Sequence, residues 1–326
     1  MGGGGLDLLA LSQQAVKSGA RSQGALVQAL QRNGVLRSAA AASALAAVDR
    51  ALFIPSRGDA VSAAYAEPYE NRPAVLDAAS GATLSAPHHH AVVTELVAER
   101  VAALAARGGG PLAVLDYGAG TGYLSHVFAE LLAHHGLRGR VMGSDAVPSL
   151  LASARSLASA RGSPAGVALE FSPAFGGGAS LAEALAGRGE AFDVVHAGFA
   201  VPEDSALCAA LLGGALRPGG SFVGALQAAR GAAQELCVVT KDASGGALRK
   251  RVVQRPVLCQ AMLSGTFDEA AARLTGPQRI QLAKEELELW KAAFERRHGR
   301  APTREELTGS DLFKRFAALR ARSWDK

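Results

Sequence analysis

The stretch that decides the fold is Leu112–Tyr123, which reads LAVLDYGAGTGY. An apolar run leads into an acid, Asp116, and Gly118, Gly120 and Gly122 then follow at every second position. In a chain with 38 glycines, an ordinary strand-to-helix connection is one interpretation. An apolar strand that ends in a glycine-spaced turn before a helix is also typical of a nucleotide-type cofactor site, and we expect the stretch to form its floor.

The spacing and the charge of this turn distinguish between cofactors. The dinucleotide fingerprint G-x-G-x-x-G needs its third glycine at position 123, where this chain has Tyr123. A carboxylate directly before the turn, here Asp116, would also repel a phosphate bound at the start of the next helix. S-adenosylmethionine has no phosphate and carries an α-ammonium and a sulfonium. The turn therefore favours S-adenosylmethionine over a dinucleotide.

A second acid stands at the end of the next expected strand. Residues 139–145 read GRVMGSD, so Asp145 closes that strand. In a parallel sheet the two strand ends lie at the same edge, and an acid after the second strand is placed to bind ribose hydroxyls. We therefore expect Asp116 and Asp145 to bind the cofactor together with the glycines.

The composition indicates one large domain with an extension. The chain has 326 residues, of which 49% are hydrophobic, and this is enough to bury a full core. Its three cysteines, Cys208, Cys237 and Cys259, are far apart and form no C-x-x-C pair. This pattern predicts a reduced, intracellular protein without a zinc site.

Neither the charge nor the hydropathy points to a nucleic acid or a membrane. Of the 34 basic and 29 acidic residues, 12 and 8 fall between Pro277 and Lys326, which leaves a nearly neutral body with 22 and 21. No window approaches the ~18 apolar residues that a membrane span needs. The start, Met1–Leu6, lacks the Ser or Thr of a myristoylation signal, and no secretory peptide follows. We expect a soluble, cytoplasmic protein.

Strands and helices alternate along the chain. Helical spacing and turn signals predict two short helices within 23–49, an irregular connection over 55–82, and helices at 88–106, 122–135, 147–161 and 203–213. Strands are expected at 112–116, 140–145, 167–171, 191–198, 221–226 and 235–240. This order predicts an α/β fold with a doubly wound, seven-stranded, Rossmann-like methyltransferase sheet, mostly parallel with an antiparallel edge.

The last part of the chain has a different pattern. Two apolar stripes recur at helical spacing on a charged background, with the members Ile280, Ala283, Leu287, Trp290 and Phe294, then Phe313, Phe316 and Leu319. Residues 302–306 offer a capping box between the stripes. We expect a flexible N-terminus over 1–22, a methyltransferase domain over 23–275 and a helical extension over 276–326. The extension either packs on its own domain as a hairpin or binds a protein partner.

A segment upstream of the first strand narrows the chemistry. Residues 83–88 read TLSAPH. This segment resembles the signature of the protein-L-isoaspartate (D-aspartate) O-methyltransferase family, in which Thr-hydrophobic-Ser-x-Pro-His precedes the cofactor strand by a similar distance. The resemblance runs in order over about residues 22–265 and includes the segments 28–36, 48–53, 192–198 and 216–220.

The resemblance implies methyl transfer from S-adenosylmethionine to the α-carboxylate of isoaspartyl residues in proteins and peptides, the first step of protein repair. It assigns Ser85 to the substrate carboxylate, as the hydroxyl that holds this group in line with the methyl. It places Ala82, Thr83, Leu84 and His90 beside the cofactor. A carboxylate has a pKa near ~4, so the reaction needs no strong general base.

Two of these assignments have simpler alternatives. Ser85, followed by Pro87, also fits the N-cap of the helix over 88–106. The three consecutive histidines, 88–90, also fit a solvated or capping cluster. A metal site would need further ligands, and the sequence offers none near them.

The chain departs from the family pattern in three places. Where the family carries Gly-Asp-Gly after its third strand, residues 172–178 read SPAFGGG and offer no acid beside the adenine. Residues 76–80, which read LDAAS, replace a glycine-aromatic-glutamine pattern in the substrate loop. The usual end of the domain gives way to 256–266 and the extension.

Three functions are compatible with these patterns. The first is an active isoaspartyl methyltransferase, and the residues that favour it are Ser85, His88, His90, Asp116 and Asp145. The second is a catalytically weak adaptor with the same fold, whose C-terminal helices recruit a partner such as a ubiquitin ligase. The altered segment 172–178 and the extension favour it. The third is a methyltransferase of small carboxylic acids, to which only the long connection 55–82 points.

Overall fold

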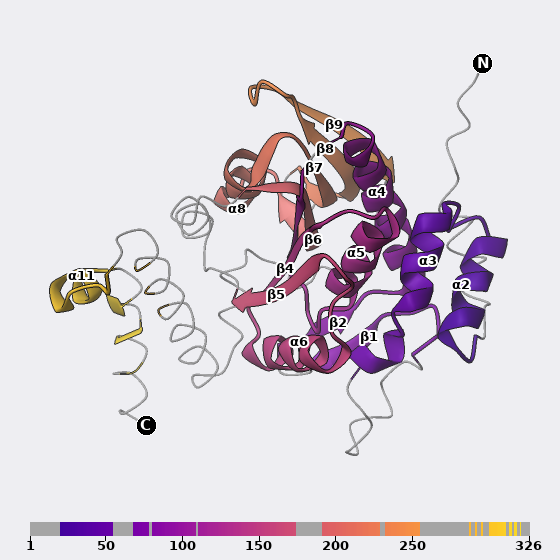
Figure 1. The fold of residues 1–326 in the computed structure, drawn as a ribbon, viewed down its shortest axis with the longest axis horizontal. Helices are drawn as coiled ribbons and strands as arrows, with labels where there is room; N and C mark the ends of the chain where they lie inside the picture. Colours follow the sequence, from indigo (N-terminus) through magenta and orange to yellow (C-terminus); the bar gives the residue numbers. More distant parts are fainter. Residues whose placement is uncertain are drawn as a thin grey trace.

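The computed structural model describes residues 20–54, 68–77, 80–108, 110–173, 191–228, 232–254 and 300–310, with 287, 291, 295, 313, 314, 316, 317 and 320. In this part of the chain, helices cover both faces of a central sheet (Figure 1). The helical segments are α2 (Gln23–Arg32), α3 (Ala39–Ala47), η1 (Arg50–Phe53), α4 (Pro87–Ala105), α5 (Tyr123–His134), α6 (Pro148–Arg161), α8 (Ala206–Ala209), η3 (Ala210–Ala215) and α11 (Arg304–Gly309). The strands are β1 (Ala74–Asp77), β2 (Ala82–Leu84), β3 (Leu112–Tyr117), β4 (Gly139–Asp145), β5 (Val167–Pro173), β6 (Phe192–Pro202), β7 (Leu216–Gln227), β8 (Gln234–Lys241) and β9 (Leu248–Gln254).

The central sheet confirms the predicted fold class. Its seven described strands lie in the order β5-β4-β3-β6-β7-β8-β9. The pairs from β5 through β7 are parallel, whereas β8 pairs antiparallel with both β7 and β9. The seventh strand, β9, reads LRKRVVQ and is mostly exposed. It lacks the apolar run by which the other strands are predicted from the sequence.

The residues of β3 show how the central sheet divides the core into two parts. All six of its residues are buried, and successive side chains of a strand point to opposite faces. Leu112 and Val114 belong to a core shared with α2, α3, α4 and α5. Ala113 and Leu115 belong to a second core shared with α8 and η3. The continuous apolar run is therefore that of a parallel strand covered on both sides.

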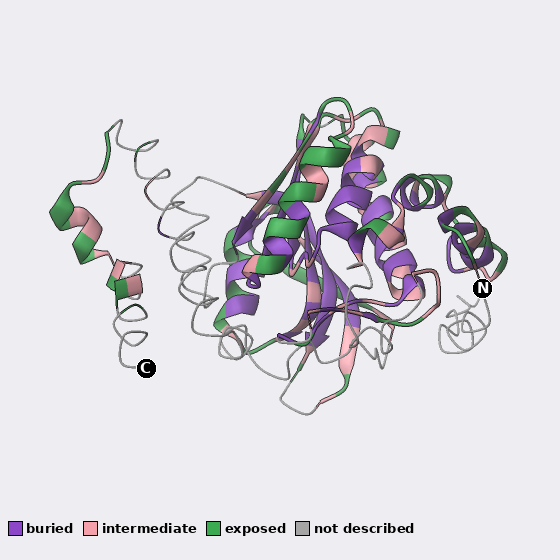
Figure 2. Cartoon of the chain, turned by 90° about the horizontal axis from the view of Figure 1, so that it is seen from below, coloured by how far each residue is buried: buried purple, intermediate pink, exposed green. Residues whose placement is uncertain are grey.

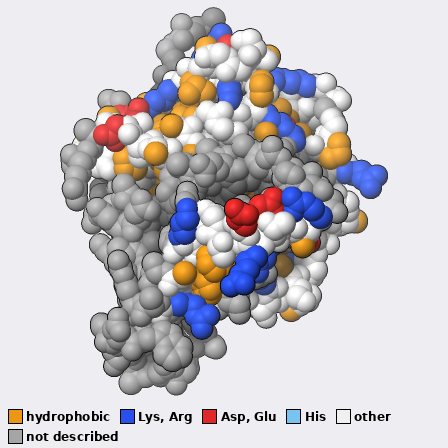
Figure 3. All heavy atoms as spheres, turned by 90° about the vertical axis from the view of Figure 1, so that its left-hand side faces the viewer, with side chains coloured by type: hydrophobic (Ala, Val, Ile, Leu, Met, Phe, Trp, Pro, Cys, Tyr) orange, Lys and Arg blue, Asp and Glu red, His pale blue; other side chains and the backbone are white. Residues whose placement is uncertain are grey.

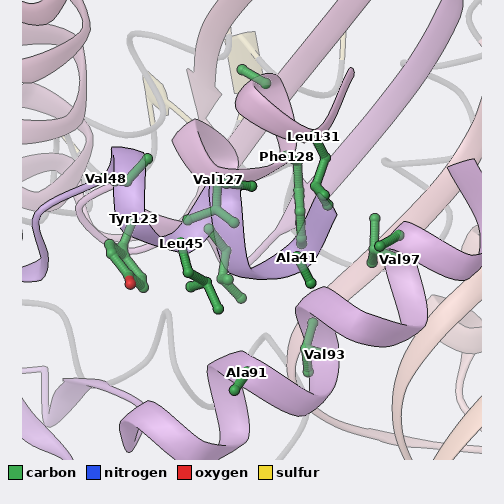
Figure 4. Packing of buried hydrophobic residues seen from close by; sticks show 14 of the residues in the cluster. Ala41, Leu45, Val48, Ala91, Val93, Val97, Tyr123, Val127, Phe128 and Leu131 are labelled. Carbon is green, nitrogen blue, oxygen red and sulfur yellow. The ribbon is translucent and has the colours of Figure 1, made fainter. Parts of the chain in front are cut away.

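Three helices pack together on the first face and set the start of α4 against the start of α5. Figure 4 shows their buried side chains, which are Ala41, Leu45 and Val48 around α3, Ala91, Val93 and Val97 of α4, and Tyr123, Val127, Phe128 and Leu131 of α5. Figure 2 shows the same division along the helices, with buried faces toward the sheet and exposed faces outward. The segments that precede α4 and α5, namely 82–86 and 118–122, are thereby held near each other.

The connection expected to be irregular over 55–82 includes β1 and leads into β2, and these two strands form a hairpin. β1 and β2 pair antiparallel, with Val75 opposite Thr83. The prediction was wrong here because strands of four and three residues are too short to show a clear alternation. Residues 55–67 lie outside the described part. The hairpin has a consequence for the site, because β2 leads directly into α4.

The C-terminal extension is described in part. The side chain of Thr303 accepts the backbone N–H of Glu306, whose carboxylate accepts the N–H of Thr303, so the predicted capping box is confirmed. Leu287, a member of the first predicted stripe, is 4% exposed. The stripe residues Ile280, Ala283, Trp290, Phe294 and Leu319 lie outside the described residues.

The charges on one side of the molecule are mixed. On the side drawn in Figure 3, basic side chains are interspersed with acidic and hydrophobic ones.

Three further observations concern membranes, metals and thiols. Within the described ranges, no helix has the length and hydropathy that crossing a bilayer requires. In the same ranges, His, Cys, Asp and Glu side chains do not gather in groups that could hold a metal ion. Cys208 and Cys237 are buried and form no disulfide, and Cys259 is outside the described part.

Candidate functional site

A pocket opens at the carboxyl ends of β3, β4 and β6, under the segment that joins β2 to α4. It is lined by Ser85 and by eight of the nine predicted cofactor residues, namely Ala82, Thr83, Leu84, His90, Asp116, Gly118, Gly120 and Asp145. The ninth, Gly122, is not among the lining residues. The structure therefore brings together two sequence segments, 82–90 and 116–120, with the end of a third, Asp145.

The backbone conformation of the turn explains why it is built from glycines. Gly118, Gly120 and Gly122 have φ values of +84°, +58° and +89°, a region that residues with a Cβ rarely adopt. A Cβ on Gly118 would also lie 2.8 Å from the Cδ1 atom of Phe199. The turn needs glycine at 118 for both reasons, and its backbone therefore forms a wall of the pocket.

Gly122 has a different role from the other two glycines. It is the N-cap residue of α5, and a Cβ there would lie 2.6 Å from the Cζ atom of Phe171. The glycine is thus required by close packing between α5 and β5. It holds the turn in place from outside the pocket.

Asp116 is the most buried acid of the pocket, with 1% of its surface exposed. Its Oδ2 accepts the Ser125 hydroxyl at 2.6 Å, and its Oδ1 lies 2.8 Å from the Nδ1 of His196. Because a carboxylate only accepts hydrogen bonds, Nδ1 of His196 carries the proton in this contact. Asp116 is therefore held from two sides and meets the pocket with a fixed orientation.

Asp145 is tied to the glycine turn. Its Oδ2 accepts the backbone N–H of Gly120 at 2.7 Å, and its Oδ1 accepts that of Val147 at 2.9 Å. The pKa of the Asp145 carboxyl is raised above its ordinary value, mainly by burial. The backbone hydrogen bonds oppose this rise, whereas the negative charge of Asp116 adds to it. Two buried carboxylates that repel each other across one pocket favour a ligand with positive charge.

The hydroxyl of Ser85 is available to a ligand. The N-cap residue of α4 is Ala86, without a side-chain cap, and Pro87 begins the helix. Instead, the Oδ1 of Asn71 accepts the backbone N–H of His88 at 2.9 Å. The interpretation of Ser85 as the N-cap was therefore wrong. Among the described residues, none forms a hydrogen bond with its hydroxyl, and the residue lines the pocket half-buried.

The three consecutive histidines have three different surroundings. The ring of His88 contacts the Oδ1 of Asn71 at 2.9 Å, and that of His90 contacts the Nη1 of Arg50 at 2.9 Å. His89 lines the pocket. Burial is the main cause that lowers the pKa of all three, that of His89 to about 3. Because the three rings have different surroundings, they do not form the solvated or capping cluster that the sequence suggested.

Several lining residues were not identified from the sequence, and His196 is the most important of them. The parallel register of β3 and β6 places His196 directly opposite Asp116. Because carboxyl ends of neighbouring parallel strands meet at one edge, a histidine near the end of the strand 191–198 was a usable signal. The apolar lining residues, among them Leu76, Leu124, Leu150 and Phe199, carry no comparable signal. Of the altered segment 172–178, only Ser172 and Pro173 lie in the described part, and neither lines the pocket.

Comparison with known proteins gives consistent results. The family model of protein-L-isoaspartate(D-aspartate) O-methyltransferase matches residues 21–256. Protein-L-isoaspartate O-methyltransferase 1 of Arabidopsis thaliana is 31% identical over 204 residues, which cover 61% of this chain and 75% of the relative. The protein-L-isoaspartate O-methyltransferase of Triticum aestivum is 30% identical over 223 residues, which cover 68% and 83%.

A solved structure shows the same fold. It is from Plasmodium falciparum, is provisionally assigned as a protein-L-isoaspartate O-methyltransferase, and contains S-adenosyl-L-homocysteine. The match has a TM-score of 0.52 and 18% identity, and it covers 72% of this chain and 94% of the other.

Proposed function

Because this chain belongs to the protein-L-isoaspartate(D-aspartate) O-methyltransferase family, we infer that it transfers the methyl group of S-adenosylmethionine to the α-carboxylate of L-isoaspartyl residues. The product is a methyl ester on a damaged protein or peptide, which begins its repair. The observation that carries this inference is the convergence of Ser85, Asp116 and Asp145 in one pocket at the carboxyl edge of the sheet. Ligands of open α/β sheets bind at that edge.

The residues of the pocket fit S-adenosylmethionine. Asp116 and Asp145 are buried acids beside a turn of glycine backbone, so the pocket is polar and negative where an α-ammonium, a sulfonium and a ribose would lie. Burial, and to a lesser extent the charge of Asp116, raises the pKa of Asp145, and positive charge in a ligand would stabilise the ionised carboxylates. We assign Asp116 to the cationic part of the cofactor and Asp145 to the ribose hydroxyls, with Gly118 and Gly120 in backbone contact.

The chain's own part in the reaction is to align the substrate. Bound S-adenosylmethionine supplies a methyl group activated by the positive sulfonium. The Ser85 hydroxyl donates a hydrogen bond to the substrate carboxylate and fixes its direction of approach, and Ala82, Thr83 and Leu84 wall the cofactor beside it. The substrate carboxylate is already ionised at neutral pH, so no side chain has to remove a proton.

A direct assay tests this function. Purified protein is incubated with labelled S-adenosylmethionine and an isoaspartyl peptide, and the base-labile methyl ester is counted. The matched control is the same peptide with a normal aspartyl residue, which should not be labelled. Labelling of both peptides alike, or of a small carboxylic acid instead, would reject the assignment. Binding of S-adenosylhomocysteine without any transfer would favour the adaptor, an alternative that the relatives described above do not support.

The division of the chain is also part of the proposal. We assign residues 23–275 to the methyltransferase domain, since the family model covers 21–256 and the described pocket residues fall between Leu76 and Phe199. We assign 276–326 to an extension whose helices contact either this domain or a protein partner. The buried side chain of Leu287 supports the first of these.

A cytoplasmic location completes the proposal. Its support is chemical, because Cys208 and Cys237 are buried thiols that are not in disulfides. Fractionation of cells that express the tagged chain would test it, and recovery with the membrane or secreted fraction would contradict it.

A further inference from the structure

Arg50 is a fully buried cation behind the pocket. Its side chain belongs to η1, and the residue is 1% exposed. Its Nη1 lies 2.9 Å from the Nδ1 of His90, and its Nη2 donates to the carbonyl oxygen of Leu84 at 3.5 Å. Both of these residues line the pocket. The guanidinium thus contacts two residues of the pocket lining without being part of that lining.

The charge of this guanidinium is not balanced inside the described protein. No carboxylate of the described ranges forms an ion pair or hydrogen bond with Arg50, and its Nε is buried without a partner. Burial lowers the pKa of Arg50 to about 10, so the group remains protonated at neutral pH. Because the described partners of this buried cation are neutral groups, an anion that comes close when the site is filled would stabilise it.

The contact with Arg50 also determines the protonation of His90. A guanidinium can only donate, so the Nδ1 of His90 must be the acceptor. His90 is neutral, because burial and the positive charge of Arg50 hold its pKa well below 6.5. Its proton therefore resides on Nε2. Among the described residues none accepts a hydrogen bond from this N–H, so it is free to bind a ligand in the pocket.

We propose that Arg50 is a positioning residue that, through His90, makes one end of the pocket a site for the α-carboxylate of the cofactor. Arg50 fixes His90 as a neutral Nε2–H donor and adds a positive potential behind it. The pocket then has two poles: Asp116 and Asp145 face the ammonium and ribose, and the pair of Arg50 and His90 faces the carboxylate. This inference rests on S-adenosylmethionine as cofactor, and it extends the proposed function to a residue outside the pocket lining.

Two ligands that differ by one carboxylate provide the test. Calorimetry measures the affinity of the full chain for S-adenosylhomocysteine and for its decarboxylated form, S-adenosyl-3-thiopropylamine. We expect the wild type to prefer the first by about tenfold or more, as for a hydrogen bond to a charged group. In Arg50→Met this preference should fall to less than about threefold, whereas Arg50→Lys, which keeps the charge, should lie between the two.

The controls separate this role from a structural one. Arg161→Met removes an arginine that is bonded to Ala47 and Glu130, away from the pocket, and should keep the wild-type preference. If Arg50 only supports the fold, Arg50→Met will weaken both ligands equally, and the proposal is rejected. A wild type that binds both ligands equally also rejects it.

A second measurement does not depend on a stable Arg50→Met variant. Nitrogen NMR of the wild type should show His90 with a protonated Nε2 and an unprotonated Nδ1, and a protonated Nδ1 would overturn the proposal. None of these readouts requires methyl transfer. A protein that prefers the carboxylate ligand but does not methylate isoaspartyl peptides would therefore refute the proposed reaction and leave the role of Arg50 intact.

Discussion

The Nδ1 of His196 lies 2.8 Å from the Oδ1 of Asp116, and both side chains are almost fully buried. The pair forms because β3 and β6 are neighbouring parallel strands whose register sets the two residues opposite each other. Asp116 meets Ser125 of α5 with its other oxygen. Asp116, near the end of β3, is therefore held by two buried side chains as well as being part of the candidate cofactor pocket.

Asp116→Asn should reduce both stability and cofactor binding. The amide has one acceptor oxygen instead of two, so either Ser125 or His196 loses its partner, and a buried unsatisfied donor costs about 1–3 kcal/mol. Urea unfolding measures the loss. Ser125→Ala supplies the control: the double variant should lose less than the sum of the single losses, because the two changes remove one shared bond. Strictly additive losses would contradict the contact.

Ser85→Ala should separate catalysis from binding. We expect the rate of methyl transfer to fall at least tenfold, because the substrate carboxylate loses the hydrogen bond that orients it toward the methyl group. Affinity for S-adenosylhomocysteine should change less than about threefold, since this hydroxyl forms no hydrogen bond within the described protein. Ser153→Ala, an exposed change on α6, is the matched control and should leave both unchanged. A wild-type rate in Ser85→Ala would remove this residue from the mechanism.

Gly118→Ala and Gly34→Ala compare two glycines with positive φ. Around Gly34 there is no atom within 4 Å of an added Cβ, so the change costs only the left-handed backbone, about 1–2 kcal/mol. At position 118 the added Cβ also meets Phe199 and disturbs the pocket. We expect a larger loss of unfolding free energy and weak cofactor binding for Gly118→Ala, measured by urea unfolding and calorimetry. Equal effects would show that close packing at 118 is unimportant.

The stability of the protein should decrease as the pH falls below about 6.5. The pKa of His89 is lowered to about 3 by burial, whereas in the unfolded chain it is near ~6.5. Between these values the unfolded state binds a proton that the folded state does not, so acid favours unfolding. His89→Asn should make the decrease shallower in urea unfolding between pH 7 and pH 5. An unchanged slope in His89→Asn would contradict the prediction.

Removal of residues 277–326 should leave a protein that binds S-adenosylhomocysteine with the affinity of the full chain. The reason is that the described pocket residues lie between Leu76 and Phe199. Calorimetry on the shortened chain checks this. An insoluble product would show instead that the extension is packed into the domain, as the burial of Leu287 suggests.

Much of the sheet could be predicted because its signals are local. The strands around Leu112–Tyr117 and Gly139–Asp145 are apolar runs covered on both faces, and the helices between them keep a regular spacing. The prediction failed where elements are short or charged. The hairpin of β1 and β2 and the edge strand β9 show no clear periodicity in the sequence. They form because they pair with neighbouring strands, and the sequence of one strand does not reveal that pairing.

The site divides in the same way. By itself, the sequence determined the turn at Gly118, Gly120 and Gly122, the acids that follow two strands, and the segment with Ser85, because backbone conformation and strand ends depend on neighbours in the chain. The tertiary structure alone decided which partner each side chain met. Asn71 capped α4 and left Ser85 free, and Arg50 fixed the proton of His90. These contacts join residues 17 and 40 positions apart, and such contacts follow from how the elements pack rather than from local sequence.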